Sequence, residues 1–131
     1  MASFDPRALP HSHLVFAAER HLATLTSLLP SGRPHVVPVG FTYDPATTTA
    51  RVIASRGSRK VRNVASGGRV VLCQFDGPRW LSFAREARVC DDPDTVADAE
   101  RRYADRYRAP RPNAQRVVIE VAVDEVLGSR A

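Results

Sequence analysis

The chain is organised around the stretch Ser55-Arg56-Gly57-Ser58-Arg59-Lys60-Val61-Arg62-Asn63. Residues 50–54 before it (ARVIA) are typical of a buried strand. Residues 60–65 are predicted to form a short helix, with the Ser58 hydroxyl as its N-cap acceptor. Such a junction offers unpaired backbone N–H groups and the positive end of a helix dipole, and its arginines and lysine can reach a bound anion. The stretch therefore predicts a site for a phosphorylated ligand.

The alternative is a solvated basic turn, because such turns are common and the glycine spacing of a Walker-type phosphate loop is absent. The net charge of +5 also permits a polyanionic partner. However, the sequence contains no helix-turn-helix, ribonucleoprotein or zinc-finger pattern. We therefore do not expect nucleic acid to be the partner.

Outward from this stretch, alternating and β-branched runs predict six strands, at residues 21–29, 34–43, 50–55, 69–76, 79–90 and 115–124. Three helices are expected: one over residues 12–20 capped by Ser12, the short crossover helix, and a longer one that follows Asp92 and ends near Tyr107. Strands joined by turns at this spacing favour an antiparallel barrel over a parallel sheet. With 44% hydrophobic residues, residues 1–131 are expected to form a single domain.

The longer helix carries an apolar stripe at three- and four-residue steps, formed by Val96, Ala99, Tyr103 and Tyr107. Its charged residues are expected to face water: Glu100, Arg101, Asp105 and Arg106. The segment over residues 109–113 (APRPN) is stiff and basic, and by itself it predicts no more than a linker.

Two residues in the second predicted strand, Pro38 and Gly40, indicate where a ligand lies. Pro38 cannot donate to a strand ladder, and Gly40 lets a backbone or a flat ligand come close. The second strand is therefore expected to be an edge, a bulge or the floor of a site. Trp80 begins the fifth strand, where a tryptophan fills the core more often than it stacks on a ligand.

Other classes of site are not indicated. Cys73 and Cys90 lie in predicted strands without a CxxC motif, so we expect buried free thiols. The four histidines match no metal-ligand spacing, and no Ser/His/Asp or Cys/His constellation suggests a catalytic side chain. The sequence shows neither a membrane span nor a signal-peptide pattern, so we expect a cytoplasmic protein with no membrane partner.

Three motifs together resemble the pyridoxamine-phosphate-oxidase-like split barrels of the flavin and deazaflavin oxidoreductases. They are residues 32–41 (GRPHVVPVGF), residues 57–63 (GSRKVRN) and Trp80. The resemblance implies a six-stranded antiparallel split β-barrel, in which the Ser-Arg-Lys element holds the cofactor phosphate and the second strand lines its ring. It implies these cofactor-binding residues: Val37, Pro38, Val39, Gly40, Ser55, Ser58, Arg59, Lys60, Arg62, Asn63 and Trp80.

Within that superfamily the chain looks like the small actinobacterial enzymes that use coenzyme F420, on segments such as residues 79–82 (RWLS) and 106–113 (RYRAPRPN). The basic residue that the oxidase's second strand offers to flavin mononucleotide (FMN) has no counterpart among Val36, Val37 and Pro38. The resemblance therefore implies F420 as the cofactor, with FMN as the alternative. It also implies a homodimer, in which the partner's residues 108–113 complete each cleft.

The reaction implied by the resemblance is hydride transfer from reduced F420 to a conjugated acceptor, biliverdin being the expected substrate and bilirubin the product. The cofactor carries the hydride, so the protein supplies binding and orientation. Arg79, Arg108 and Arg111 are candidates for pairing with the substrate's propionates, although each could serve solubility alone. The alternatives are a noncatalytic flavin, deazaflavin or tetrapyrrole binding protein and an FMN-dependent enzyme of the oxidase type.

Overall fold

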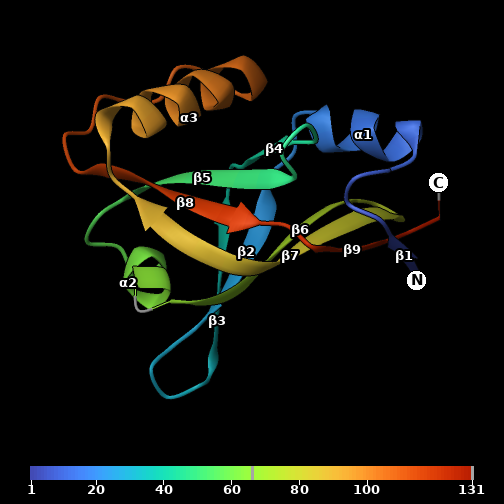
Figure 1. The fold of residues 1–131 in the computed structure, drawn as a ribbon, viewed down its shortest axis with the longest axis horizontal. Coiled ribbons are helices and arrows are strands. Elements are labelled where there is room, and N and C mark those ends of the chain that lie inside the picture. The colour runs from blue at the N-terminus through green and yellow to red at the C-terminus, as the bar shows by residue number, and fades with distance from the viewer. Residues whose placement is uncertain (66, 131) are drawn as a thin grey trace.

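A computed structural model describes residues 1–65 and 67–130 of the chain, and these residues form one mainly antiparallel β fold (Figure 1). The elements in chain order are β1 (Ala2–Phe4), α1 (His11–Ala18), β2 (Ala23–Leu28), β3 (Pro34–Val39), β4 (Thr42–Asp44), β5 (Thr49–Ser55), α2 (Arg59–Ala65), β6 (Gly68–Asp76), β7 (Arg79–Cys90), α3 (Pro93–Arg106), β8 (Arg116–Ala122) and β9 (Glu125–Gly128).

The sheet runs in the order β3-β2-β6-β7-β8-β5-β4, and β9 joins β1 to β7. Figure 1 shows β2 and β3 crossing the direction of β5 and β8, so the sheet is strongly bent. Among the described residues no ladder joins β3 to β5, although the short β4 links them along the chain. The sheet is therefore open at this point, in agreement with the expected split barrel.

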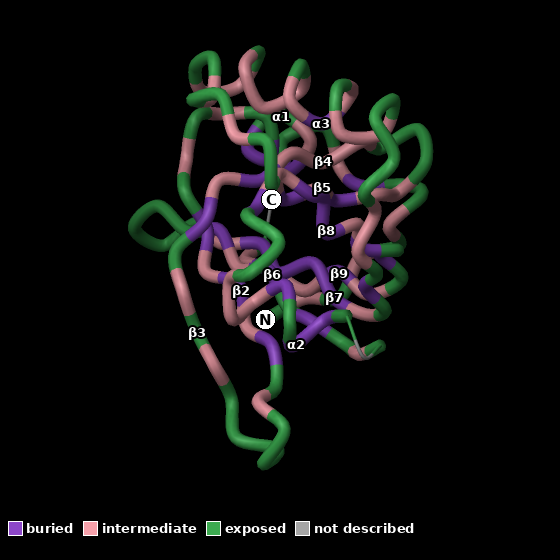
Figure 2. Tube along the Cα trace, turned by 90° about the vertical axis from the view of Figure 1, so that its left-hand side faces the viewer, coloured by how far each residue is buried: buried purple, intermediate pink, exposed green. Residues whose placement is uncertain are grey.

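The bent sheet encloses an apolar core drawn from both of its halves. Its largest fully buried side chains include Phe41, Phe83, Leu25, Leu72 and Ile119. The Phe83 ring contacts both Phe41 and Tyr43, which ties the middle of β7 to the β3–β4 connection. Figure 2 shows buried residues concentrated in the central strands, while the β2–β3 turn extends beyond them and is exposed.

All six predicted strands are present, but the second one is divided. It ends at Val39 and resumes at Thr42, and the rings of Tyr103 and Tyr107 lie beside Gly40 in the interruption. β3 is an edge strand, as Pro38 predicted. Two further strands, β1 and β9, pair with each other and were not predicted.

The helices are at the expected places, with corrections at two of their caps. Asp92 caps α3 by accepting a hydrogen bond from the Thr95 N–H at 3.0 Å, as predicted. Pro10, not Ser12, precedes α1, so the cap predicted for Ser12 is wrong. Ser58 does precede α2, but its hydroxyl donates to the Ser55 carbonyl at 2.8 Å instead of accepting.

Two other side-chain expectations also need correction. Arg106 was expected to face water, and it is half-buried against backbone carbonyls. The thiols of Cys73 and Cys90 are free, but both are only half-buried. Partial burial raises the pKa of each thiol. None of the described helices has the length and apolar character needed to cross a bilayer.

Candidate functional site

A groove of about 510 Å³ lies at the opening between β3 and β5. This volume is in the range of cofactor and small-molecule sites. Its walls come from four parts of the chain: β3, β5, the start of α2, and the end of α3 with the segment that follows. The lining residues are Pro38, Val39, Gly40, Ile53, Ala54, Ser55, Lys60, Tyr103, Arg108, Ala109, Pro110, Arg111, Asn113 and Arg116.

The β3 side of the groove is a flat, mainly apolar floor. Pro38 and Gly40 present no long side chain to it, and Val39 is buried in the core. Opposite them stands the ring of Tyr103, which lies so close to Gly40 that a Cβ atom there would be 2.8 Å from the Tyr103 Cε2 atom. The part of the floor at Pro38 carries no long side chain and suits a planar ring system, whereas the space beside Gly40 is filled by the Tyr103 ring.

The other walls of the groove carry positive charge. Lys60 comes from α2, and Arg108 and Arg111 come from the segment after α3. In the part of the chain that the structure describes, none of these three cations has a carboxylate within salt-bridge distance, and no carboxylate lines the groove. The groove is therefore suited to an anionic ligand, since Lys60, Arg108 and Arg111 have no carboxylate partner among the described residues.

The segment over residues 108–113 is held in place by contacts to β5 and β8. Asn113 Nδ2 donates to Ser55 Oγ at 2.8 Å, and the Arg56 N–H donates to the Gln115 carbonyl at 2.9 Å. Arg116 pairs with Glu100 at 2.6 Å and donates to the Arg111 carbonyl at 2.8 Å. This chain's own segment thus lines its own groove. The expectation that the partner's residues 108–113 complete each cleft stays a prediction, because a single chain does not test it.

The predicted cofactor residues divide into two sets. The groove contains Pro38, Val39, Gly40, Ser55 and Lys60, and the predicted substrate residues Arg108 and Arg111 lie with them. Outside it lie Val37, Ser58, Arg59, Arg62 and Asn63. Val37 packs against the core, and Asn63 is buried with its Nδ2 donating to Ser27 Oγ at 3.1 Å. Arg59 turns back to donate to Asn63 Oδ1 at 3.4 Å.

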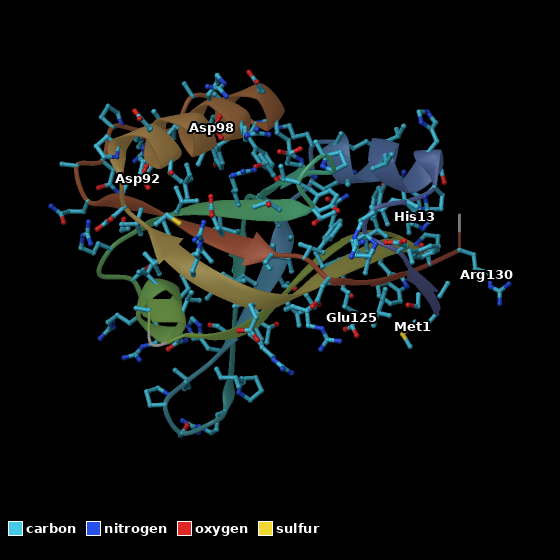
Figure 3. All side chains as sticks on the ribbon, in the orientation of Figure 1. Met1, His13, Asp92, Asp98, Glu125 and Arg130 are labelled. Carbon is cyan, nitrogen blue, oxygen red and sulfur yellow. The ribbon has the colours of Figure 1, made fainter. Side chains whose placement is uncertain are left out.

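Arg79 and Trp80 lie at a separate cavity of about 110 Å³ beside α1. Figure 3 shows His13 and Arg130, which line this cavity, at the end of the molecule away from Asp92. Arg79 pairs with Glu19 at 3.1 Å and with Asp76 at 2.6 Å, and its hydrogen bonds to Glu19 lower the pKa of that carboxyl. Within one chain these two residues therefore do not join the groove.

Several lining residues of the groove were not among the predicted site residues, and Tyr103 and Asn113 are the clearest examples. Tyr103 was assigned to the packing stripe of α3, although the same spacing brings its ring to the helix face beside Gly40. Asn113 was read from its own sequence as part of a linker, and it was expected at a cleft only as part of the partner's residues 108–113. Its position directly before β8 was the available signal, because an asparagine at a strand entrance commonly bonds a neighbouring backbone or side chain.

Comparisons with known proteins agree with this architecture. The chain is 58% identical over 116 residues to the F420H(2)-dependent biliverdin reductase of Mycobacterium tuberculosis, covering 88% of this chain and 85% of that protein. A conserved hypothetical protein of M. tuberculosis has a similar solved structure (TM-score 0.79, 16% identity, 98% of this chain and 89% of that chain). An F420 reductase also has a similar solved structure (TM-score 0.69, 23% identity), covering 92% of this chain and 98% of that chain.

The solved structures show the fold alone, and the family follows from the sequence. Residues 9–130 match the family described as pyridoxamine 5'-phosphate oxidase, which is nearly the whole chain. The three motifs that had indicated this family are residues 32–41, residues 57–63 and Trp80. The chain belongs to the pyridoxamine 5'-phosphate oxidase family.

Proposed function

We propose that the protein is a coenzyme F420-dependent reductase that transfers a hydride from the reduced cofactor to a conjugated acceptor, biliverdin in the first place. The observation that carries the proposal is the groove between β3 and β5, which joins a flat floor to three cations without carboxylate partners among the described residues. The extensive identity to a biliverdin reductase supports both the cofactor and the substrate.

The residues of the groove fit a cofactor that has a planar ring and an anionic tail. When bound in its reduced form, the cofactor supplies the hydride. In this proposal the ring lies against Pro38, Val39 and Gly40, and Lys60 binds the phosphate, since all four residues line the groove. Holding the ring against a fixed floor sets the face from which an acceptor approaches, and such orientation accounts for much of the rate in reactions of this kind.

F420 suits the groove better than FMN because its longer tail carries more negative charge. Lys60 stands on the α2 side, whereas Arg108 and Arg111 stand on the opposite segment. A ligand with several anionic groups can contact both sides at once. Arg108 and Arg111 are equally placed to bind the propionates of biliverdin, and Arg79, which lies outside the groove, is not placed to do so within one chain.

The test is an anaerobic assay with reduced F420 and biliverdin, in which the absorbance of bilirubin and of oxidised cofactor is followed. We expect stoichiometric cofactor oxidation, tighter binding of F420 than of FMN, and little turnover with NADPH, for which the chain has no dinucleotide fingerprint. Tight F420 binding without turnover would favour a noncatalytic binding protein. Tight FMN binding without F420 binding would instead favour an FMN-dependent enzyme of the oxidase type.

We also propose that the protein is a homodimer formed through the outer face of β3, β2 and β6. Large apolar side chains are exposed there, namely Leu28 (52%), Val36 (55%), Val71 (39%) and Phe75 (60%). Val36 and Val71 both lie opposite Thr26, so they share one face of the sheet. Contiguous exposed apolar residues commonly mark interaction surfaces. Figure 2 shows β3 as an outer strand with alternating exposure.

The dimer would give Trp80 a place in the site. Trp80 lies directly opposite Phe75 in the β6–β7 ladder, so its side chain is on the same face as the apolar patch. In a dimer formed through this patch, Trp80 faces the partner subunit rather than its own groove. A role for Trp80 at the cofactor is therefore proposed across the subunit interface.

Sedimentation velocity at micromolar concentration should show a dimer, and Val71→Glu should shift it to monomer, because a charge would be buried in the apolar interface. The control is Val15→Glu, which places the same charge at a residue of α1 that is 46% exposed and lies outside the patch. A monomeric wild-type protein would contradict the proposed interface, and so would dissociation of both variants.

We further propose a cytoplasmic location. The free thiols of Cys73 and Cys90 support it, because reduced cysteines are typical of proteins from reducing compartments. Cell fractionation with an antibody against the protein would test it, and recovery in the secreted fraction would contradict it.

A further inference from the structure

The last residue of α3 is fixed to two distant parts of the backbone. The Arg106 guanidinium donates to the Glu19 carbonyl through Nε (2.9 Å) and Nη2 (2.6 Å) and to the Phe41 carbonyl through Nη1 (2.5 Å). It also lies over the Phe41 ring, with its Cζ atom 4.7 Å from the ring centroid. These acceptors are neutral. Burial lowers the pKa of Arg106, but a guanidinium remains charged in proteins.

Gln74 completes this arrangement from the centre of β6. Its side chain is fully buried, with Nε2 donating to the Phe16 carbonyl at 2.8 Å and Oε1 accepting from Arg106 Nη2 at 2.6 Å. Only this orientation of the amide satisfies both contacts, because the backbone oxygen needs a donor and the guanidinium needs an acceptor. Gln74 therefore fixes the position of Arg106 relative to the sheet.

Tyr107 follows Arg106 and holds the same part of the backbone. Its hydroxyl donates to the His21 carbonyl at 2.6 Å and accepts from the Phe41 N–H at 3.2 Å. Burial raises the pKa of this hydroxyl, so it stays protonated and able to donate. Both backbone groups of Phe41 are thus bound by the end of α3, the N–H by Tyr107 and the carbonyl by Arg106.

These bonded residues are direct neighbours of the two sides of the groove. Phe41 follows Gly40, the end of the floor, and Tyr107 precedes Arg108, the start of the opposite wall. We propose that Arg106, Gln74 and Tyr107 are positioning residues of the groove, which fix the distance between its floor and its basic wall. This inference rests on the proposed function, because it takes F420 as the ligand that the spacing serves.

The first test is F420 affinity, measured by fluorescence titration well below the melting temperature of each variant. Arg106→Lys should weaken binding by about 10-fold or more, because a single ammonium cannot replace a planar fork that bonds three separate acceptors. Tyr107→Phe should also weaken F420 binding, since this substitution leaves the Phe41 N–H without its acceptor.

Two control variants separate positioning from general stability. Arg101→Lys changes an exposed arginine of the same helix that pairs with Asp98, and should leave affinity unchanged. Val126→Ala removes buried volume from β9, which lines no part of the groove, and should lower the melting temperature without changing affinity. Unchanged affinity in Arg106→Lys, or an equal loss in Val126→Ala, would overturn the inference.

Amide hydrogen exchange provides a readout that needs no ligand. In Arg106→Lys and Tyr107→Phe, the amides of Phe41 and of the segment over residues 108–113 should exchange faster, while those of β9 should not. Uniform or unchanged exchange would overturn the positioning role. Failure of the wild-type protein to bind F420 would overturn the proposed function, and the exchange result would still decide whether these residues hold the two sides of the groove.

Discussion

Replacement of Lys60 by alanine is expected to raise the dissociation constant for F420 by about 10- to 100-fold. Lys60 lines the groove from α2 and has no carboxylate partner among the described residues, so its charge is available to the ligand. A hydrogen bond between charged groups contributes about 1.5–3 kcal/mol. That range corresponds to roughly one to two orders of magnitude in affinity. The measurement is a fluorescence titration at moderate ionic strength.

Arg56→Ala is the matched control, because this substitution removes the same charge from the same turn. Arg56 itself pairs with Asp91 at 3.3 Å and does not line the groove. The affinity of Arg56→Ala for F420 should stay close to that of the wild type. Arg59→Ala should have a smaller effect than Lys60→Ala, since Arg59 is turned toward Asn63. Equal losses in Lys60→Ala and Arg56→Ala would mean that general charge attraction, and not a specific contact, explains binding.

The larger strands could be predicted because they are alternating or β-branched runs of six or more residues, several of which end close to a glycine or proline. β1 and β9 could not, since three or four residues are too few to show a period. They are strands because they pair with each other and because β9 also pairs with β7, which sequence alone does not reveal. The packing of Gly40 against Tyr103 likewise could not be predicted, because α3 follows Gly40 by more than fifty residues.

The error at Arg106 has a specific physical origin. Its spacing from Ala99 and Tyr103 places it on the buried stripe of α3, but its charge was taken to mean exposure. The stripe packs where the Glu19 and Phe41 carbonyls are turned toward the helix, and a guanidinium satisfies them better than an apolar side chain does. At this position the helical spacing of the apolar stripe predicted burial correctly, whereas the charge of the residue did not.

The site was partly predictable for a similar reason. Pro38, Gly40 and Lys60 are marked by local chemistry, namely a missing donor, a missing side chain and a cation at a strand-to-helix turn. Lys60 lines the groove, whereas Arg59 donates to Asn63. This difference depends on the direction of each side chain within one turn of α2, which the sequence does not show. Tyr103 and Asn113 enter the groove only because α3 and β8 pack beside β5.

Gly40→Ala is expected to weaken F420 binding by about 10-fold or more and to cost about 1–3 kcal/mol of stability through overpacking. The added Cβ atom would lie 2.8 Å from Tyr103 Cε2 and 3.2 Å from Tyr107 Cε2. Tyr107 cannot retreat, because its hydroxyl is held by His21 and Phe41. The Tyr103 ring has no hydrogen bond among the described residues, so it must move, and it lines the groove. The backbone itself is not strained, since Gly40 does not have a positive φ.

The control for this substitution is Gly68→Ala, because a Cβ atom at Gly68 meets nothing within 4 Å and the residue lies outside the groove. The double variant Gly40→Ala with Tyr103→Leu then tests the route of the effect. If the displaced ring causes the loss, a smaller side chain should restore part of the affinity, and the two substitutions will not be additive. Additive losses in titrations of the single and double variants would show instead that Gly40 contacts the ligand without Tyr103 as an intermediary.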